Sequence, residues 1–203
     1  MNENASLFFV DRHVDSHIKE KKAFIEYGSN QKFITYADLH EQSSKLRHFF
    51  SKFKINREDR VIILMQDVIS YPIIFWGCLK SGVIPVLLNT LLSSEVVNEI
   101  INNSRAKAVF ISSRLLSSFE NSVKKNVSIK HIIEVGTKKS KYINFEEEIQ
   151  KCSFQDTIKC SKDEIAFWLY SSGSTGQPKG VKHVHGSLES VSYTHLTLPT
   201  KSS

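Results

Sequence analysis

The stretch RVIILMQDVISYPIIFWGCLKSGVIPVLL, residues 60–88, decides the fold. Its start, Arg60–Met65, is a largely apolar run and predicts a strand covered on both faces. Ile69–Leu79 then predicts a helix, which ends at Ser81-Gly82 because glycine accepts the left-handed conformation that closes many helices. Val83–Leu88 predicts the next buried strand. A strand, a helix and a strand in this order are typical of a parallel βαβ unit.

The same alternation continues on both sides of this unit. On the amino-terminal side, the sequence predicts an amphipathic helix through Leu7, Val10, Val14 and Ile18, strands at Ala23–Tyr27 and Lys32–Tyr36, and a helix that starts at Thr35 or Tyr36. On the other side it predicts strands at Ala108–Ile111, His131–Val135 and Ile165–Tyr170, and helices from Ser93 or Ser94, at Ser113–Val123 and at Glu146–Lys151. The fold class is therefore α/β, with a mostly parallel sheet and helices on both faces.

The composition is that of a globular chain. It has 203 residues, of which 40% are hydrophobic, and a net charge of +6 with basic and acidic residues interleaved. This balance favours a solvated surface over a nucleic-acid groove. Three cysteines without a C-x-x-C pair indicate neither a disulfide framework nor a metal site. Pro72, Lys80 and Gly82 interrupt the apolar tract 68–88, so we expect no membrane span and a cytoplasmic protein.

The residues that carry chemistry lie in YSSGSTGQPKGVKHVH, Tyr170–His185, directly after a predicted buried strand. Glycines let the backbone approach a ligand, and successive free N–H groups in such a loop suit phosphate oxygens. The hydroxyl groups add neutral donors, and Lys179 adds a cation. The spacing differs from G-x-x-x-x-G-K-[ST], because the lysine follows Gly176 by three residues. The alternative for a Gly/Ser cluster of this kind is a flexible surface loop.

The ordered string Ser171–Gly180 resembles the phosphate-binding signature of the adenylate-forming superfamily, which contains acyl-CoA synthetases and the adenylation domains of peptide synthetases. Further resemblance lies in Ile34–Leu39, Asp59–Met65 and Phe75–Val86. Within the superfamily, three stretches are most similar to the benzoate-CoA ligase branch: Phe8–Val14, Asn89–Leu92 and Asp163–Gly176. Lys182 and Val184 depart from the usual pattern, which has an apolar residue and a threonine there.

The resemblance implies an ATP-dependent acid–CoA ligase, with an aromatic, benzoate-like acid as substrate, ATP and Mg²⁺ for activation, and coenzyme A as co-substrate. It implies that the phosphates of ATP are held by Ser171, Ser172, Gly173, Ser174, Thr175, Gly176, Lys179 and Gly180. It places His185 near the acyl pocket; a packed or surface histidine is the alternative.

The resemblance also implies boundaries. Residues 1–190 correspond to the first part of the large domain of an AMP-dependent synthetase, and family members are more than twice as long. The catalytic lysine of the family is expected in the missing part, so we expect the chain as written to be inactive. Residues 191–203 begin with VSYTHLTLPT, which resembles the translation of a transposon-end adapter used in sequencing libraries, and we expect this tail to be non-native. A natural Thr-rich strand is the alternative.

Two other functions stay open at this stage. An adenylation domain that loads an acyl group onto a carrier protein would share the same signature, and so would a non-catalytic nucleotide-binding remnant. The sequence does not identify the acid, because one methylene or hydroxyl group changes discrimination by only about 1–3 kcal/mol in an apolar pocket. It does not identify the acceptor or the oligomeric state either.

Overall fold

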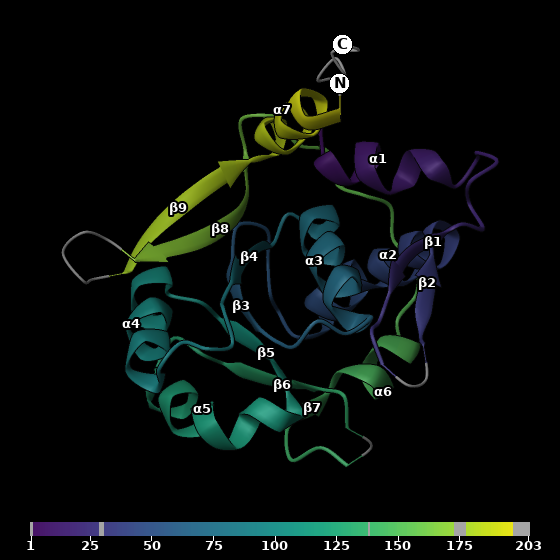
Figure 1. Ribbon diagram of the computed structural model, residues 1–203. Helices are drawn as coiled ribbons and strands as arrows, with labels where there is room; N and C mark the ends of the chain where they lie inside the picture. Colours follow the sequence, from purple (N-terminus) through teal and green to yellow (C-terminus); the bar gives the residue numbers. More distant parts are fainter. Residues whose placement is uncertain (1, 29–30, 138, 173–177, 197–203) are drawn as a thin grey trace, which may run out of the picture.

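The structure, a computed structural model, describes residues 2–28, 31–137, 139–172 and 178–196. Within them a seven-stranded sheet has the order β7-β6-β5-β3-β4-β8-β9 (Figure 1). All neighbouring pairs are parallel except β8 and β9, which are antiparallel. The strands are β3 (Arg60–Leu64), β4 (Ile84–Leu87), β5 (Ala108–Ser112), β6 (His131–Val135), β7 (Ile143–Asn144), β8 (Ile165–Ser172) and β9 (Pro178–Val184). The predicted fold class is confirmed.

The central strand β3 is buried on both faces, as its apolar run predicts. Ile62 pairs with Val86 of β4 and with Val109 of β5. Successive side chains of a strand point to opposite faces. Accordingly, Val61 and Ile63 belong to one core cluster, whereas Ile62 and Leu64 belong to the other.

Helices cover each face. Helices α2 (Tyr36–Lys52) and α3 (Ser70–Ser81) pack on the face that carries Ile63, and α4 (Ser94–Ser104) and α5 (Ser113–Lys125) pack on the face that carries Ile62 (Figure 1). Helices α2 and α3 approach closely at Gly77, where an added Cβ would lie 2.4 Å from Leu46 Cγ.

Local signals set the helix ends where the sequence predicts them. Thr35 caps α2 in a reciprocal capping box with Asp38. Ser93 caps α4 by accepting a bond from the Val96 amide. Helix α3 ends at Gly82, whose φ of 68° is in the left-handed region.

The amino-terminal segment differs from its prediction. Instead of one amphipathic helix, it forms α1 (Ala5–Phe9), a short 3₁₀ helix (Asp11–His13) and a series of turns. The chain leaves α1 at Val10, which is fully buried against Ile34 and Leu39. Asp11 then turns inward to an ion pair with Lys80, and these two buried contacts interrupt the regular helix.

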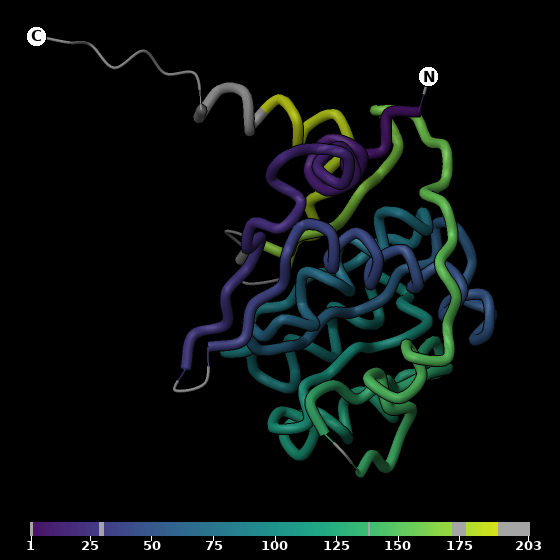
Figure 2. The backbone as a smooth tube through the Cα atoms, turned by 90° about the vertical axis from the view of Figure 1, so that its right-hand side faces the viewer, coloured from purple at the N-terminus to yellow at the C-terminus, as the bar shows by residue number. Residues whose placement is uncertain are grey.

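The predicted strand pair is confirmed as the antiparallel strands β1 (Lys22–Ile25) and β2 (Phe33–Thr35), which form a separate two-stranded sheet. After the short helix α6 (Phe145–Gln150), residues 152–161 run in extended form along the outside of the molecule toward β8 (Figure 2). The two-residue strand β7 is too short for the sequence pattern to predict.

Helix α7 (His185–Leu196) follows β9 and lies beside α1 in both views (Figures 1 and 2). The alternative of a Thr-rich strand is therefore wrong for residues 191–196. In the described ranges, none of the helices combines the length and the apolar character that a membrane span requires.

Candidate functional site

The predicted phosphate-binding signature joins β8 to β9 as an antiparallel ribbon. Ser171 pairs with Lys179, and Ser172 pairs with Pro178. The ribbon thus brings Ser171, Ser172, Lys179 and Gly180 together next to the tip. The remaining signature residues lie outside the described residues: Gly173, Ser174, Thr175 and Gly176.

The ribbon starts from the edge of the sheet at which ligands usually bind in open α/β folds. Leu169 of β8 pairs in parallel with Leu87, the last residue of β4. The signature therefore begins in the last two residues of β8, on the edge where β3 and β4 also end. Crevices outside the carboxyl ends of parallel strands are the usual ligand sites of this architecture.

A tyrosine that the sequence analysis missed supports the ribbon. A Cβ at Gly180 would lie 3.1–3.3 Å from ring atoms of Tyr170 on the paired strand, so the ring occupies the space beside the glycine. The Tyr170 hydroxyl donates a hydrogen bond to Asn103 Oδ1 of α4 at 2.5 Å. Burial raises the pKa of Tyr170 above its ordinary value. Because Asn103 is 67 positions away, no local pattern reveals this contact.

Lys179 is exposed on β9. Among the described residues, neither a hydrogen bond nor an ion pair engages its ammonium group, which leaves this cation available to an anion near the tip. The other lysine of the strand, Lys182, lies with its Nζ 5.3 Å from the Trp168 ring centroid. Lys179 and Lys182 carry the same charge on the same strand but have different surroundings. Substituting each in turn therefore separates the effect of position from the effect of charge.

His185 lies at the opposite end of β9 from the signature. Its side chain is 3% exposed, and its Nδ1 accepts a hydrogen bond from the Ala5 amide at 3.1 Å. Burial lowers its pKa to about 4, so the imidazole is neutral at physiological pH. In this structure the ring joins the start of α7 to α1, and its role at an acyl pocket stays a prediction.

The neighbouring histidine and aromatic residues are packed. His183 stacks on Phe167 with the ring centroids 4.6 Å apart. Phe167 is buried in the core cluster that also holds Ile63, and its ring lies 5.7 Å from that of Phe75. These side chains fix β8 and β9 to the body of the sheet.

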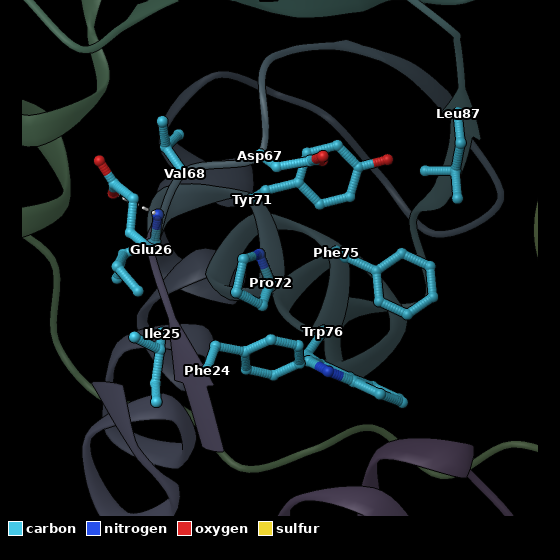
Figure 3. A pocket seen from close by; sticks show the side chains of 11 residues that line it. Phe24, Ile25, Glu26, Asp67, Val68, Tyr71, Pro72, Phe75, Trp76 and Leu87 are labelled. Carbon is cyan, nitrogen blue, oxygen red and sulfur yellow. Dashed lines mark hydrogen bonds between the residues drawn. The ribbon is translucent and has the colours of Figure 1, made fainter. Parts of the chain in front are cut away.

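An apolar pocket, also missed by the sequence analysis, opens at the carboxyl edge of the sheet and has a volume of about 420 Å³ (Figure 3). Its walls come from β1, from the loop after β3, from the first half of α3 and from the end of β4. The lining residues are Phe24, Ile25, Glu26, Asp67, Val68, Ile69, Tyr71, Pro72, Phe75, Trp76 and Leu87. The glutamate is held in place because Glu26 Oε2 accepts the Ile69 amide at 3.1 Å.

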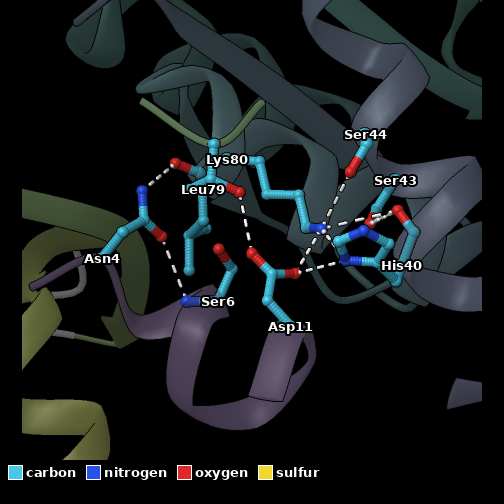
Figure 4. Close-up of polar contacts among 9 residues, drawn as sticks. Asn4, Ser6, Asp11, His40, Ser43, Ser44, Leu79 and Lys80 are labelled. Carbon is cyan, nitrogen blue, oxygen red and sulfur yellow. Dashed lines mark hydrogen bonds and ion pairs between the residues drawn. The ribbon is translucent and has the colours of Figure 1, made fainter. Parts of the chain in front are cut away.

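A buried polar cluster surrounds Lys80 of α3 (Figure 4). Lys80 is 1% exposed, and its ammonium group contacts Asp11 Oδ1 at 2.5 Å and Ser44 Oγ at 2.9 Å. His40 Nδ1 lies 2.9 Å from Asp11 Oδ1, and Thr157 donates a hydrogen bond to Asp11 Oδ2 at 2.8 Å. The cluster thereby joins the amino-terminal segment to α2, α3 and the extended segment 152–161.

The charges in this cluster are balanced. Burial alone would raise the pKa of Asp11, but hydrogen bonds from His40, Lys80 and Thr157 outweigh it and hold the pKa below its ordinary value. Burial lowers the pKa of Lys80, and the Asp11 charge opposes this effect. A lone lysine within an apolar helix was the available sequence signal for a buried ion pair.

The described residues contain no group of three or more His, Cys, Asp and Glu side chains arranged to hold a metal ion. The described part of the candidate site offers backbone amides, a hydroxyl group and the Lys179 cation.

The fold and the ribbon define an α/β protein whose mostly parallel sheet carries Ser171 and Ser172 at the carboxyl end of β8, paired with Lys179 and Pro178 of β9. The family model described as AMP-binding enzyme matches residues 10–201, and the chain belongs to this family.

The relatives include CoA ligases. The chain is 33% identical over 186 residues to the 4-hydroxybenzoate–CoA/benzoate–CoA ligase of Rhodopseudomonas palustris, a match that covers 91% of this chain and 34% of the relative. It is 30% identical over 188 residues to the acetyl-coenzyme A synthetase of Bacillus subtilis, with 90% and 32% covered. Among solved structures, a benzoate CoA ligase from Burkholderia xenovorans LB400 superposes with a TM-score of 0.80 at 26% identity, with 95% and 36% covered.

The resemblance to adenylate-forming enzymes and to benzoate-CoA ligases is confirmed by these matches. The chain spans about a third of the length of the relatives that it matches.

Proposed function

We propose that this chain is part of an ATP-dependent ligase that joins an aromatic, benzoate-like acid to coenzyme A. The observation that carries the proposal is the signature Ser171–Gly180, which begins at the carboxyl end of β8 and has the Lys179 ammonium group unpaired among the described residues. The similarity to a benzoate–CoA ligase over 91% of the chain supports the choice of substrate class.

The proposed reaction has two steps. A carboxylate oxygen attacks the α-phosphorus of ATP, forming an acyl-adenylate while the bond to pyrophosphate breaks. The thiolate sulfur of coenzyme A then attacks the carbonyl carbon, and the bond to AMP breaks to leave a thioester. The first step brings an anionic acid to an anionic triphosphate, so positive charge and N–H donors must be concentrated there.

The residues of this chain supply part of that charge. Ser171, Ser172 and Gly180 would line the triphosphate with hydroxyl groups and close backbone, and Lys179 would neutralise the departing pyrophosphate. The proposal extends the same role to Gly173, Ser174, Thr175 and Gly176. Mg²⁺ usually binds through one or two carboxylates together with the substrate phosphates, and the proposed roles of these residues do not depend on the ion.

The test uses the intact protein encoded by the complete open reading frame. ATP, benzoate and coenzyme A should give benzoyl-CoA and AMP, and Lys179→Met should lower kcat/KM by roughly 10²–10³-fold, the usual loss for one group that stabilises transition-state charge. Lys182→Met, which removes an equal charge from the same strand, should change kcat/KM by less than about threefold.

The outcomes separate the alternatives. Equal effects of the two substitutions would contradict the proposed role of Lys179. Benzoate-dependent ATP–pyrophosphate exchange without thioester formation would favour a carrier-protein acceptor, and no exchange at all would favour a nucleotide-binding remnant.

We further propose that residues 1–190 are the family portion, that residues 191–203 are a non-native tail, and that the chain as written completes neither half-reaction. The resemblance of VSYTHLTLPT to adapter sequence supports the tail, although the family match extends to residue 201 and α7 to Leu196. Resequencing the source DNA tests the non-native tail: a frame that reads through residue 203 into family sequence without adapter bases would contradict it. Steady benzoyl-CoA formation by the purified 203-residue chain would contradict the proposal that this chain completes neither half-reaction.

A further inference from the structure

The β8–β9 ribbon extends beyond the part of the sheet that supports it. Strand β8 pairs with β4 at Trp168 and Leu169, and Leu169 lies opposite Leu87, the last residue of β4. From Tyr170 to Ser172, β8 pairs with β9 alone among the described strands. Because an isolated two-stranded hairpin is only marginally stable in water, this end of the ribbon needs a further contact to keep one orientation.

Tyr170 supplies that contact. Its ring packs against the core cluster to which α4 contributes, and its hydroxyl donates a hydrogen bond to Asn103 Oδ1 of α4 at 2.5 Å. Figure 1 shows α4 beside the end of the ribbon that carries the signature. Among the described side chains of residues 170, 171 and 178–180, this is the one hydrogen bond to the rest of the protein.

The same ring also reaches the strand that carries Lys179. Tyr170 pairs directly with Gly180, and its ring atoms lie 3.1–3.3 Å from the place where a Cβ of Gly180 would be. A displacement of the ring relative to α4 would therefore displace the backbone of β9 at Gly180, and with it the neighbouring Lys179.

We propose that Tyr170 is a positioning residue for the ligase reaction: its hydrogen bond to Asn103 holds the ribbon in the orientation at which Lys179 meets the departing pyrophosphate. The inference rests on the proposed function and deepens it, because it names a residue that acts through Lys179 without touching a substrate. A charge stabilises a transition state best when it is already in place, and a misplacement of about 1 Å can lower a rate by roughly 10²-fold.

The test uses the intact protein and measures benzoate-dependent ATP–pyrophosphate exchange. Tyr170→Phe removes the hydroxyl but keeps the ring beside Gly180, and Asn103→Leu removes the acceptor at an exposed position. Each should lower kcat by roughly 10- to 100-fold and leave the KM for benzoate within about twofold. The matched control is Tyr142→Phe, which removes a tyrosine hydroxyl that bonds Glu120 of α5 near the opposite edge of the sheet, and which should change kcat by less than about twofold.

Double substitutions separate positioning from a general loss of folded enzyme. If Tyr170 acts through Lys179, Tyr170→Phe should change kcat by less than about threefold in the Lys179→Met background, where the positioned charge is already gone. A loss of folded enzyme would lower kcat by the same factor in both backgrounds, and that result would overturn the inference. Adding Asn103→Leu to Tyr170→Phe should have little further effect, since both remove the same hydrogen bond.

Hydrogen exchange tests the contact without any substrate. The amides of Lys179, Gly180 and Val181 should exchange about three- to tenfold faster in Tyr170→Phe, the effect of one hydrogen bond, while those of β3 stay unchanged. Unchanged exchange on β9, or an unchanged kcat, overturns the inference even if Lys179→Met disables the enzyme. Failure of the inference is therefore distinct from failure of the proposed function.

Discussion

At the scale of single residues, the buried charges of Lys80 and Asp11 have partners inside the protein. Lys80 reaches Asp11 inside the protein, and its ammonium group also contacts Ser44 Oγ, His40 Nδ1 and the His40 carbonyl. His40 Nδ1 lies within hydrogen-bond distance of Asp11 as well. A buried ion pair contributes little net stability when intact, but the loss of one partner leaves an uncompensated charge.

The first prediction concerns this ion pair. Lys80→Met should lower the free energy of unfolding by about 3–5 kcal/mol, because the Asp11 carboxylate stays buried without its counterion. Lys52→Met is the matched control: it breaks the ion pair with Glu148 at a lysine whose side chain is 42% exposed, and it should lower the free energy by less than about 1 kcal/mol. Urea denaturation measures both, and similar losses would contradict the assignment.

The second prediction concerns pH. The pKa of His185 is about 4 in the folded protein and about 6.5 in the unfolded chain, so the unfolded chain binds the extra proton between these values. Stability should therefore be complete above pH 6.5 and decline as the pH falls toward 4. After allowance for solvent screening, the loss is about 2 kcal/mol.

Denaturation midpoints between pH 4 and pH 7 measure this dependence. His185→Gln should remove most of the decline, since glutamine does not titrate, whereas His183→Gln should retain it. An unchanged slope in His185→Gln would show that another group is responsible.

At the scale of elements, two close approaches determine how neighbouring segments pack. Tyr170 fills the space beside Gly180 in the ribbon, and Leu46 fills the space beside Gly77 between α2 and α3. At both positions a neighbouring side chain occupies the space that a Cβ would need, and neither glycine has a positive φ. A substitution at Gly77 should be tolerated less well than one at Gly180, because the Ser43 backbone as well as the Leu46 side chain limits the space at Gly77.

The third prediction follows from that contact. The Cβ of Gly77→Ala would lie 2.4 Å from Leu46 Cγ and 2.9 Å from the Ser43 carbonyl oxygen, so α2 and α3 must separate. Overpacking of this kind lowers stability by about 1–3 kcal/mol despite the better helix propensity of alanine. Ser51→Ala, at an exposed position of α2, should change stability by less than about 0.5 kcal/mol. Thermal unfolding distinguishes the two, and a neutral Gly77→Ala would contradict the close contact.

Most elements could be predicted because their signals are local. The apolar run of β3, the Thr35 cap and Gly82 each act within a few residues, and each predicted its element within two residues. The break after α1 could not be predicted, because Asp11 is held by Lys80, which lies far along the chain. For the same reason the sequence revealed the signature Ser171–Gly180 but not Tyr170–Asn103 or the apolar pocket, which depend on tertiary packing.

At the scale of the whole molecule, the sheet lies between two helical layers, and each layer buries its own core cluster. Ile62 and Ile63 are neighbours in β3, yet they belong to different clusters and are both fully buried. A sheet with one solvated face would bury only one of them.

The fourth prediction tests this arrangement. Ile62→Ala and Ile63→Ala should each lower the free energy of unfolding by about 2–5 kcal/mol, since each leaves a cavity in one of the two clusters. Val127→Ala, at an 89% exposed site, should be nearly neutral. Chemical denaturation compares the three variants, and a small effect of either isoleucine would mean that its face of the sheet is open.

The hydrogen bond between Ala5 and His185 has a consequence for synthesis on the ribosome, because its two ends are 180 positions apart. At about 5–20 residues per second, the partner of Ala5 is translated roughly ten to forty seconds after Ala5 itself. Helix α1 also meets α3, where Asn4 donates a hydrogen bond to the Leu79 carbonyl. The contact with the start of α7 is therefore the part of its surroundings that is completed last.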